Sequence, residues 1–116
     1  MTSQAKRRGT ETETWTVQYA RDHGRRAEKI ARAGELDEGD VWVELPSGLV
    51  VIQVKARRRL DLPGALRDAA DQAVNFAAAR GLLEVPRSYV VSRPYGYGER
   101  RMDDWIVSQR FAQLIA

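Results

Sequence analysis

Apolar and polar positions alternate most clearly in two runs near the middle of the chain. Residues 41–45 (VWVEL) alternate with a period of two, which predicts a β-strand with unlike faces. A Pro46-Ser47-Gly48 turn separates them from residues 49–56, the most apolar run of the sequence. The length and β-branched content of this second run predict a strand in the centre of a sheet.

The remaining pattern predicts helices and further strands around this hairpin. Residues 1–9 are rich in basic side chains, and we expect them to form a flexible arm. Thr10 or Thr12 is predicted to cap a helix that runs to about His23, and Asp61 to cap a second helix of about 18 residues. Further strands are expected at 26–32, 87–92 and 104–107, and a short terminal helix at 108–114.

These elements predict a single domain of the α/β class, spanning residues 10–116. A chain of 116 residues is long enough for one modest core. The predicted order is one helix, three strands, a helix and a strand, followed by a last strand and a short helix. This order favours a mixed central sheet with helices on its faces.

Composition excludes several classes of protein. The absence of cysteine excludes disulfides and thiolate zinc sites, and a single histidine excludes multi-histidine metal sites. No apolar run approaches the roughly 20 residues of a membrane span, so we expect no membrane partner. The N-terminus lacks the apolar region of a secretory signal, so the expected location is the cytoplasm.

The distribution of charge is more informative than the net charge of +3. Basic residues cluster at 6–8, 25–26, 57–59 and 100–101, whereas acidic residues gather at 11–13 and 35–40. Basic clusters around an acidic pocket suit a protein that holds a polyanion and places a divalent cation against it. The alternative is that each cluster is a set of solvated loop charges.

The hairpin brings an acid close to a polar-x-Lys step. Period-two geometry places Gln53 and Lys55 on the same face of their strand. If the turn pairs Leu45 with Gly48, then Asp40 lies directly opposite Gln53. A glycine bulge at Gly48 would shift this register by one residue. In either case Asp40 is expected beside the Gln53–Lys55 step.

This arrangement suits metal-dependent cleavage of phosphodiesters, in which Mg²⁺ or Mn²⁺ polarises the phosphate and activates water. Asp40 supplies a carboxylate, and the Gln53 side chain and the Val54 carbonyl could supply neutral oxygen ligands. Lys55 would stabilise charge on the phosphate, and Glu13 is the best remote carboxylate. The alternatives are a turn role for Asp40, helix-dipole compensation for Glu13 and an ordinary solvated lysine at position 55.

A second set of residues is predicted to contact DNA. An arginine cluster directly follows the motif strand, and a later glycine-rich loop carries side chains that could stack on bases or follow the backbone. A mobile hairpin is the alternative for that loop. The candidate DNA-binding residues are Arg7, Arg8, Arg57, Arg58, Arg59, Arg93, Tyr95 and Tyr97.

The spacing from Gly39-Asp40 to Gln53-Val54-Lys55, after an acid-bearing helix, resembles the PD-(D/E)xK nuclease superfamily. The segments that carry a fuller resemblance, to small phage and prophage Holliday junction resolvase-like nucleases, are RGTETE at 8–13, GELDEGDV at 34–41, VIQVKARRRLDL at 51–62 and GYGERRMDDWIV at 96–107. The resemblance implies a restriction-endonuclease-like αβββαβ core.

The resemblance also assigns roles to single residues. It implies that Asp40 is the metal-binding acid, Lys55 the catalytic lysine and Glu13 the glutamate of the first helix. Gln72 falls where such enzymes often place a polar residue near the site. Gln53 departs from the pattern, because the usual residue there is Glu.

The first hypothesis is therefore a divalent-metal-dependent DNA endonuclease that acts on branched DNA, in the host-cell cytoplasm if the chain is phage-encoded. Symmetric cutting of two strands implies a homodimer, with Trp42 or the last strand as candidates for its interface. A catalytically inactive DNA-binding or regulatory module on the same fold is the alternative that Gln53 favours. A restriction-like or repair nuclease would differ only in its substrate.

Overall fold

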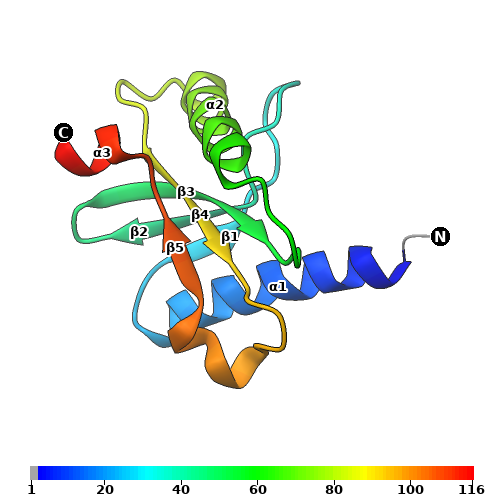
Figure 1. The fold of residues 1–116 in the computed structure, drawn as a ribbon. Helices are drawn as coiled ribbons and strands as arrows, with labels where there is room; N and C mark the ends of the chain where they lie inside the picture. Colours follow the sequence, from blue (N-terminus) through cyan, green and yellow to red (C-terminus); the bar gives the residue numbers. More distant parts are fainter. Residues whose placement is uncertain (1–2) are drawn as a thin grey trace.

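Five strands form one mixed sheet in the computed structural model, which describes residues 3–116 (Figure 1). The strands are β1 (Ala27–Lys29), β2 (Val41–Leu45), β3 (Gly48–Lys55), β4 (Arg87–Ser92) and β5 (Ile106–Ser108). They lie in the order β1-β2-β3-β4-β5; only β3 and β4 run parallel, and the other neighbours are antiparallel. The most apolar run is therefore the central strand, as predicted.

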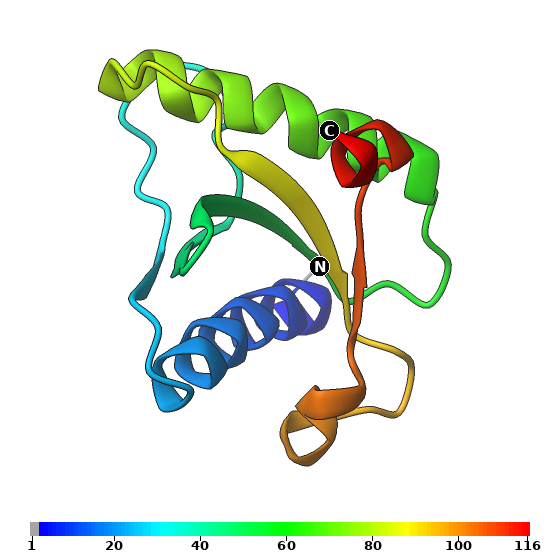
Figure 2. The same ribbon diagram turned by 90° about the vertical axis from the view of Figure 1, so that its left-hand side faces the viewer.

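Two long helices cover opposite faces of this sheet (Figure 2). The helices are α1 (Ser3–Asp22), α2 (Leu62–Arg80), the 3₁₀ helix η1 (Glu99–Asp104) and the short α3 (Phe111–Ile115). This single α/β domain confirms the predicted fold class. None of the helices within residues 3–116 is long and apolar enough to cross a bilayer.

The side chains of β3 alternate between the two helices. Val50 and Ile52 belong to a core cluster that includes Val17 of α1. Val51 points the other way and packs with Ala73 and Phe76 of α2. Because successive side chains leave a strand on opposite faces, Gln53 and Lys55 share the α2 side with Val51.

The ends of α2 follow from its sequence. The Asp61 carboxylate accepts a hydrogen bond from the Gly64 N–H at 3.2 Å, with Pro63 in the first turn. Gly81 ends the helix in the left-handed conformation, with φ of 64°. The buried face is mostly alanine (Ala65, Ala69, Ala73 and Ala77), which lets the helix lie close to the sheet.

The structure corrects the prediction for the N-terminus. Helix α1 begins at Ser3 rather than at a cap on Thr10 or Thr12, so residues 3–9 of the expected arm are helical; residues 1–2 lie outside the described part. The segment is rich in good helix formers, so one internal glycine is tolerated. The Thr12 hydroxyl donates to the Arg8 carbonyl oxygen at 2.6 Å, as a threonine inside a helix does.

Smaller corrections apply at the C-terminus. The last strand begins at Ile106 rather than Asp104, because residues 99–104 form η1. The terminal helix is flanked by Arg110 at its N-terminus and not by Ser108.

Candidate active site

Asp40 is held between two strands. The hairpin register pairs Leu45 with Gly48 and Val41 with Ile52, so no bulge shifts it. The Asp40 N–H donates to the Ile52 carbonyl oxygen at 3.1 Å, and the Asp40 carbonyl oxygen accepts from the Ile30 N–H at 2.9 Å. This residue thus extends the sheet on both sides, directly beyond the Val41–Ile52 pair, and lies beside the Gln53–Lys55 step, as predicted.

The glycine before Asp40 is required by the backbone. Gly39 has φ of 95°, a conformation that side chains other than glycine rarely adopt. A Cβ at this position would also lie 2.7 Å from the Val51 Cγ1 atom. The chain can therefore turn sharply into β2 only with glycine at position 39, and this turn delivers the carboxylate to the site.

The Asp40 carboxylate is half-buried at the end of β3. Its Oδ2 atom accepts a hydrogen bond from the Val54 N–H at 2.8 Å. Burial raises the pKa of Asp40 above its ordinary value, and the charge of Asp37 raises it further; the Val54 hydrogen bond and the charge of Lys55 oppose the rise. The ionised carboxylate is therefore short of positive charge around it.

Glu13 brings a second carboxylate from α1. Burial raises the pKa of Glu13, and the Asp40 charge raises it further, whereas the Lys29 charge lowers it. The two carboxylates are thus close enough to repel each other although 26 residues of chain lie between them. A cation placed against both would relieve that repulsion. Lys29 was not predicted as a neighbour of the site.

Two buried glutamines leave oxygen atoms without partners. The side chains of Gln53 and Gln72 are 7% and 6% exposed, and the Oε1 atom of each has no hydrogen-bond donor within the described chain. An unsatisfied buried acceptor costs about 1–3 kcal/mol, so each oxygen marks a place for a water molecule or a cation. Gln53 directly precedes Val54, whose N–H binds the Asp40 carboxylate, whereas the Gln72 Nε2 atom donates to the Asp37 carboxylate at 3.1 Å. Gln72 therefore lies near the site, as the resemblance implied.

The donor set fits a hard divalent cation. Within residues 3–116 no group of three or more His, Cys, Asp or Glu side chains is placed to hold a metal ion, so carboxylates alone do not form the site. Mg²⁺ commonly uses one or two carboxylates and fills its other positions with water and substrate oxygens. Asp40 and Glu13 could supply the carboxylates, and the Gln53 Oε1 atom and the Val54 carbonyl could supply neutral oxygens.

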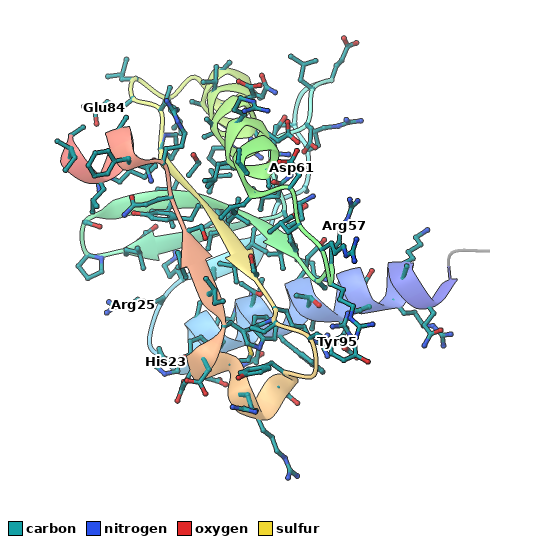
Figure 3. The ribbon with its side chains drawn as sticks, in the orientation of Figure 1. His23, Arg25, Arg57, Asp61, Glu84 and Tyr95 are labelled. Carbon is teal, nitrogen blue, oxygen red and sulfur yellow. The ribbon has the colours of Figure 1, made fainter. Side chains whose placement is uncertain are left out.

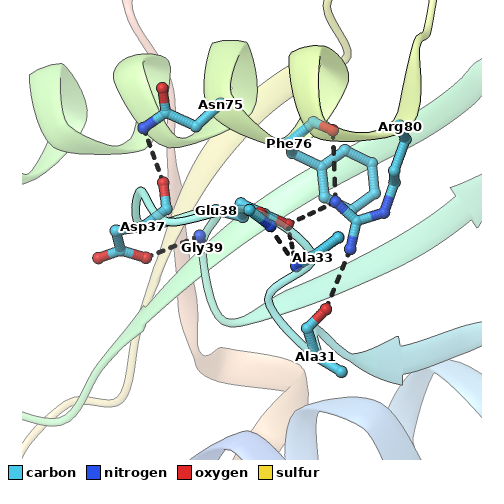
Figure 4. Close-up of polar contacts among 9 residues, drawn as sticks. Ala31, Ala33, Asp37, Glu38, Gly39, Asn75, Phe76 and Arg80 are labelled. Atoms are coloured by element: carbon cyan, nitrogen blue, oxygen red, sulfur yellow. Dashed lines mark hydrogen bonds and ion pairs between the residues drawn. The ribbon is translucent and has the colours of Figure 1, made fainter.

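The loop that carries Asp40, residues 30–40 (the acidic loop), is fastened to α2 (Figure 4). The Glu38 side chain is 1% exposed and forms an ion pair with Arg80. It also accepts hydrogen bonds from the N–H groups of Ala33 and Gly34, at 3.1 and 2.7 Å. Burial by itself would raise the pKa of Glu38, but the hydrogen bonds from Arg80 and these two amides outweigh it and hold the pKa below its ordinary value.

Asp37 gives the acidic loop a second attachment. Its carboxylate accepts from the Gly39 N–H at 3.0 Å, the turn role expected for it, and its carbonyl oxygen accepts from the Asn75 Nδ2 atom at 2.8 Å (Figure 4). The sequence did not predict the roles of Glu38, Arg80 and Asn75. About 40 residues of chain separate Glu38 from Arg80 and Asp37 from Asn75, so no local pattern in the sequence indicates either contact.

The loop after β3, residues 56–61 (the arginine loop), lies on the other side of Lys55. Lys55 and Arg57 line a cleft of about 350 Å³ together with Asp61 and Arg67 of the α2 region. Arg57, Arg58 and Arg59 are all exposed. The cluster therefore emerges beside the predicted site, as expected from its position directly after the strand.

The N-terminal part of helix α1 lies beside the start of the arginine loop. The Arg8 Nε atom donates to the Ala56 carbonyl oxygen at 3.1 Å, which ties the first turns of α1 to the start of the arginine loop. Arg7 is exposed and precedes it on the helix. Basic residues from two distant segments thus gather at one end of the sheet.

The three candidate DNA-binding residues of the loop after β4, namely Arg93, Tyr95 and Tyr97, lie in different environments. The Arg93 side chain is 9% exposed, pairs with Glu11 at 2.8 Å and donates to the Tyr97 carbonyl oxygen at 2.8 Å, so it is engaged inside the protein and not presented to a ligand, unlike the exposed residue expected from the sequence. Tyr97 is half-buried against the core, and the Arg101 guanidinium lies 3.9 Å from its ring centre. Only Tyr95 is open, and it lies at the same end of the sheet as Arg57 (Figure 3).

Comparison with known proteins identifies the fold. No model of a known protein family matches the chain, and no curated protein sequence does. Among solved structures, the chain is similar to Hjc, a Holliday junction resolvase from the archaeal hyperthermophile Archaeoglobus fulgidus. The two share 20% sequence identity and a TM-score of 0.56, over 87% of this chain and 71% of the resolvase. This likeness confirms the restriction-endonuclease-like fold that the sequence predicted.

Proposed function

We propose that this chain is a divalent-metal-dependent endonuclease that hydrolyses phosphodiester bonds in branched DNA. The observation that carries the proposal is that the Asp40 carboxylate interacts with both Glu13 and Lys55, on a strand that also carries the buried Gln53, whose Oε1 atom has no partner in the described chain. Clustered carboxylates with raised pKa values are common at functional sites. The fold likeness to a resolvase supports DNA as the substrate and branched DNA as its form.

Mg²⁺ or Mn²⁺ would be held by Asp40, Glu13, the Gln53 Oε1 atom and the Val54 carbonyl. When bound, the ion polarises the scissile phosphate and lowers the pKa of the attacking water. The protein's own contribution begins with the Val54 N–H, which fixes the orientation of the Asp40 carboxylate. The Gln53 side chain is buried, and its Oε1 atom has no partner within the described chain, so it is available as a neutral ligand.

Lys55 supplies the positive charge on the side of the substrate. It is half-buried on the same face of β3 as Gln53 and lines the cleft with Arg57. Its ammonium group donates hydrogen bonds to the phosphate, whose negative charge grows in the transition state, or orients the attacking water. Because the strand fixes its backbone, little reorganisation is needed as the charge develops.

The DNA-binding surface combines Arg57, Arg58 and Arg59 with Arg7 and Arg8. Arginine binds phosphate groups well, because its planar guanidinium forms two parallel hydrogen bonds. The Ala56 contact limits the movement of Arg8, so Arg8 positions the helix as well as contributing charge. Tyr95 adds an exposed aromatic ring to this surface.

A homodimer would place two such sites on one branched substrate. The surface that suits it is the edge formed by β5 and α3, where Ile106, Val107, Phe111, Leu114 and Ile115 are each more than half exposed. Val107 also lines an apolar hollow of about 530 Å³ on the α1 side of the sheet. Soluble monomers seldom expose a contiguous apolar patch of this kind. Phe111→Asp should convert the dimer to monomer in sedimentation experiments.

Cleavage assays test the proposed activity. A four-way junction, a linear duplex and a single strand of matched sequence are incubated with Mn²⁺ or with EDTA. The wild type should cut the junction in Mn²⁺ only, and Asp40→Ala and Lys55→Ala should each lower the rate by about a thousandfold or more while DNA binding persists. Asp71→Ala, an exposed acid of α2, is the matched control. Unchanged cleavage by both site variants, or cleavage in EDTA, would contradict the proposal.

A catalytically inactive DNA-binding module on the same fold is the second candidate. Gln53 favours it, because a neutral amide replaces the usual carboxylate and leaves the site with fewer charged ligands. The retained Asp40 and Lys55 count against it. Junction binding without cleavage, together with no heat of Mn²⁺ binding, would favour this module over the nuclease.

A further inference from the structure

Tyr95 occupies the tip of a tight turn beside the candidate site. The Tyr97 N–H donates to the Pro94 carbonyl oxygen at 3.0 Å, and Gly96, the third residue of the turn, has φ of 80°. Positive φ at that position alone is the signature of a type II turn. The ring of Tyr95 is 66% exposed, which makes it one of the largest open apolar surfaces in the molecule.

The base of this turn is fixed from inside the protein. The Arg93 Nε atom donates to the Tyr97 carbonyl oxygen, and its guanidinium bonds to Glu11 at 2.8 Å and to the Thr12 hydroxyl at 3.2 Å. These contacts join the turn to α1. Tyr95 is therefore an exposed aromatic side chain on a rigid support, which lowers the entropy lost when something binds to it.

Arg58 of the arginine loop covers one face of the Tyr95 ring. Its Cζ atom lies 4.2 Å from the ring centre, within the range of a cation–π contact. Tyr95 is 66% exposed, and Arg58 is the cation that covers its ring, so the ring also presents surface to solvent for a further contact. The pair thus forms a platform in which a cation backs an aromatic ring that remains open to solvent.

The platform lies at the same end of the sheet as the catalytic lysine. Lys55 is paired with Ser92 at the ends of β3 and β4, and the Arg93 N–H donates to the Lys55 carbonyl oxygen at 2.9 Å. The two loops that carry Arg58 and Tyr95 leave the sheet at these residues. A strand held in the cleft would therefore pass close to the open ring.

We infer that Tyr95, backed by Arg58 on its other face, stacks on a nucleobase exposed at an interruption of the double helix, and so directs binding to branched DNA. This inference rests on the proposed function. In an intact duplex the neighbouring base pairs cover both faces of each base, but a branch point leaves a face open. Stacking of one base on an aromatic side chain contributes about 1–3 kcal/mol whatever the base, so the platform reads structure and not sequence.

The test measures selectivity without cleavage. Anisotropy of fluorescein-labelled DNA in EDTA gives affinities for a four-way junction and for a linear duplex of the same sequence. Tyr95→Ala should lower junction affinity about tenfold more than duplex affinity, whereas Tyr95→Trp should keep the wild-type ratio. Arg59→Ala, an exposed arginine of the same loop, should weaken both complexes by the same factor.

The outcomes separate this inference from the proposed function. Equal effects of Tyr95→Ala on both DNAs, or no effect, would overturn the platform even if the wild type cleaves junctions. Selective binding that depends on Tyr95, by a wild type that never cleaves, would support the platform and contradict the nuclease. A wild type that binds neither DNA would overturn both.

Discussion

The two loops that flank the candidate site differ in how they are held. The acidic loop is attached to α2 by the buried Glu38–Arg80 pair and by the Asn75 hydrogen bond to Asp37. The three arginines of the arginine loop are exposed; Arg58 contacts the Tyr95 ring, and Arg8 holds the start of the loop through the Ala56 carbonyl oxygen. The acidic loop is held by buried polar contacts of its side chains, whereas the side chains of Arg57, Arg58 and Arg59 lie exposed to solvent.

This difference matches the chemistry proposed for the two loops, which is metal binding beside the acidic loop and phosphate binding by the arginine loop. Ligands of a metal ion must stay within tenths of an ångström of a productive geometry, so the residues that orient them need firm support. Phosphate groups of DNA are held largely by long-range attraction, which tolerates movement of the arginines. The buried side-chain contacts of the acidic loop thus lie on the side proposed for metal binding, and the exposed arginines on the side proposed for DNA binding.

The largest effect is expected from breaking the attachment of the acidic loop. Arg80→Ala leaves the Glu38 charge buried without its partner and should lower the free energy of unfolding by about 3 kcal/mol at pH 7. Because the pKa of Glu38 lies below its ordinary value, the pair stabilises the protein above the ordinary pKa of glutamate and less as pH falls. Urea unfolding at pH 7 and pH 4 should therefore show a smaller difference at the lower pH.

The matched control for this change is a surface ion pair. Arg26 and Glu44 lie 3.7 Å apart with side chains 76% and 50% exposed, so Arg26→Ala should change stability by less than about 1 kcal/mol. If Arg26→Ala and Arg80→Ala lowered the free energy of unfolding equally, the Glu38–Arg80 pair would hold the acidic loop no more firmly than an ordinary surface ion pair.

A smaller effect of opposite sign is expected at Asp40. Its folded pKa is raised, so between the ordinary and raised values the folded chain binds more protons than the unfolded chain and stability falls as pH rises. Asp40→Asn removes this loss, and the metal-free variant should be more stable than the wild type by about 1 kcal/mol at pH 7. The gain should vanish below the ordinary value of 3.8.

Asp71→Asn provides the control for the charge change, since Asp71 is exposed on α2. It should alter stability by less than about 0.5 kcal/mol at either pH. A loss of stability in Asp40→Asn at pH 7 would show that the carboxylate is a structural residue and not a strained functional one.

The smallest change in stability is expected in the arginine loop. Arg57→Ala should leave the free energy of unfolding within about 0.5 kcal/mol of the wild type, because the side chain is exposed. It should weaken binding to any DNA and reduce the salt dependence of the affinity by about one phosphate contact. Unfolding curves check the stability, and a salt series of binding measurements checks the affinity for DNA. A folded variant with undiminished DNA affinity would show that Arg57 is not part of the DNA-binding surface.

Local patterns predicted the part of the molecule that carries the candidate chemistry. Alternation predicted the faces of β3, and the short Pro46-Ser47-Gly48 turn predicted the register that brings Asp40 beside the Gln53–Lys55 step. Asp61 and Gly81 marked the ends of α2 because caps are local interactions. These features depend on residues close together in the chain, which is why they could be read from it.

The features that the sequence did not predict depend on contacts between residues far apart along the chain. Nothing near Arg93 in the sequence shows that Glu11 and Thr12 surround it, so it looked like its exposed neighbour Tyr95. Glu38 and Arg80 are separated by a hairpin and most of a helix, and neither belongs to a motif. The basic run at residues 6–8 suggested an arm, although helix propensity and the Arg8 contact extend α1 through it.

The central claim is that Glu13, Asp40 and Gln53 hold a divalent cation, and calorimetric titration with Mn²⁺ tests it most directly. The wild type should bind in the millimolar range or tighter, Asp40→Asn should lose that binding, and Gln53→Glu should bind severalfold more tightly because it adds a negative charge to the ligand set. Absence of binding in both the wild type and Gln53→Glu, with each protein folded, would contradict the claim.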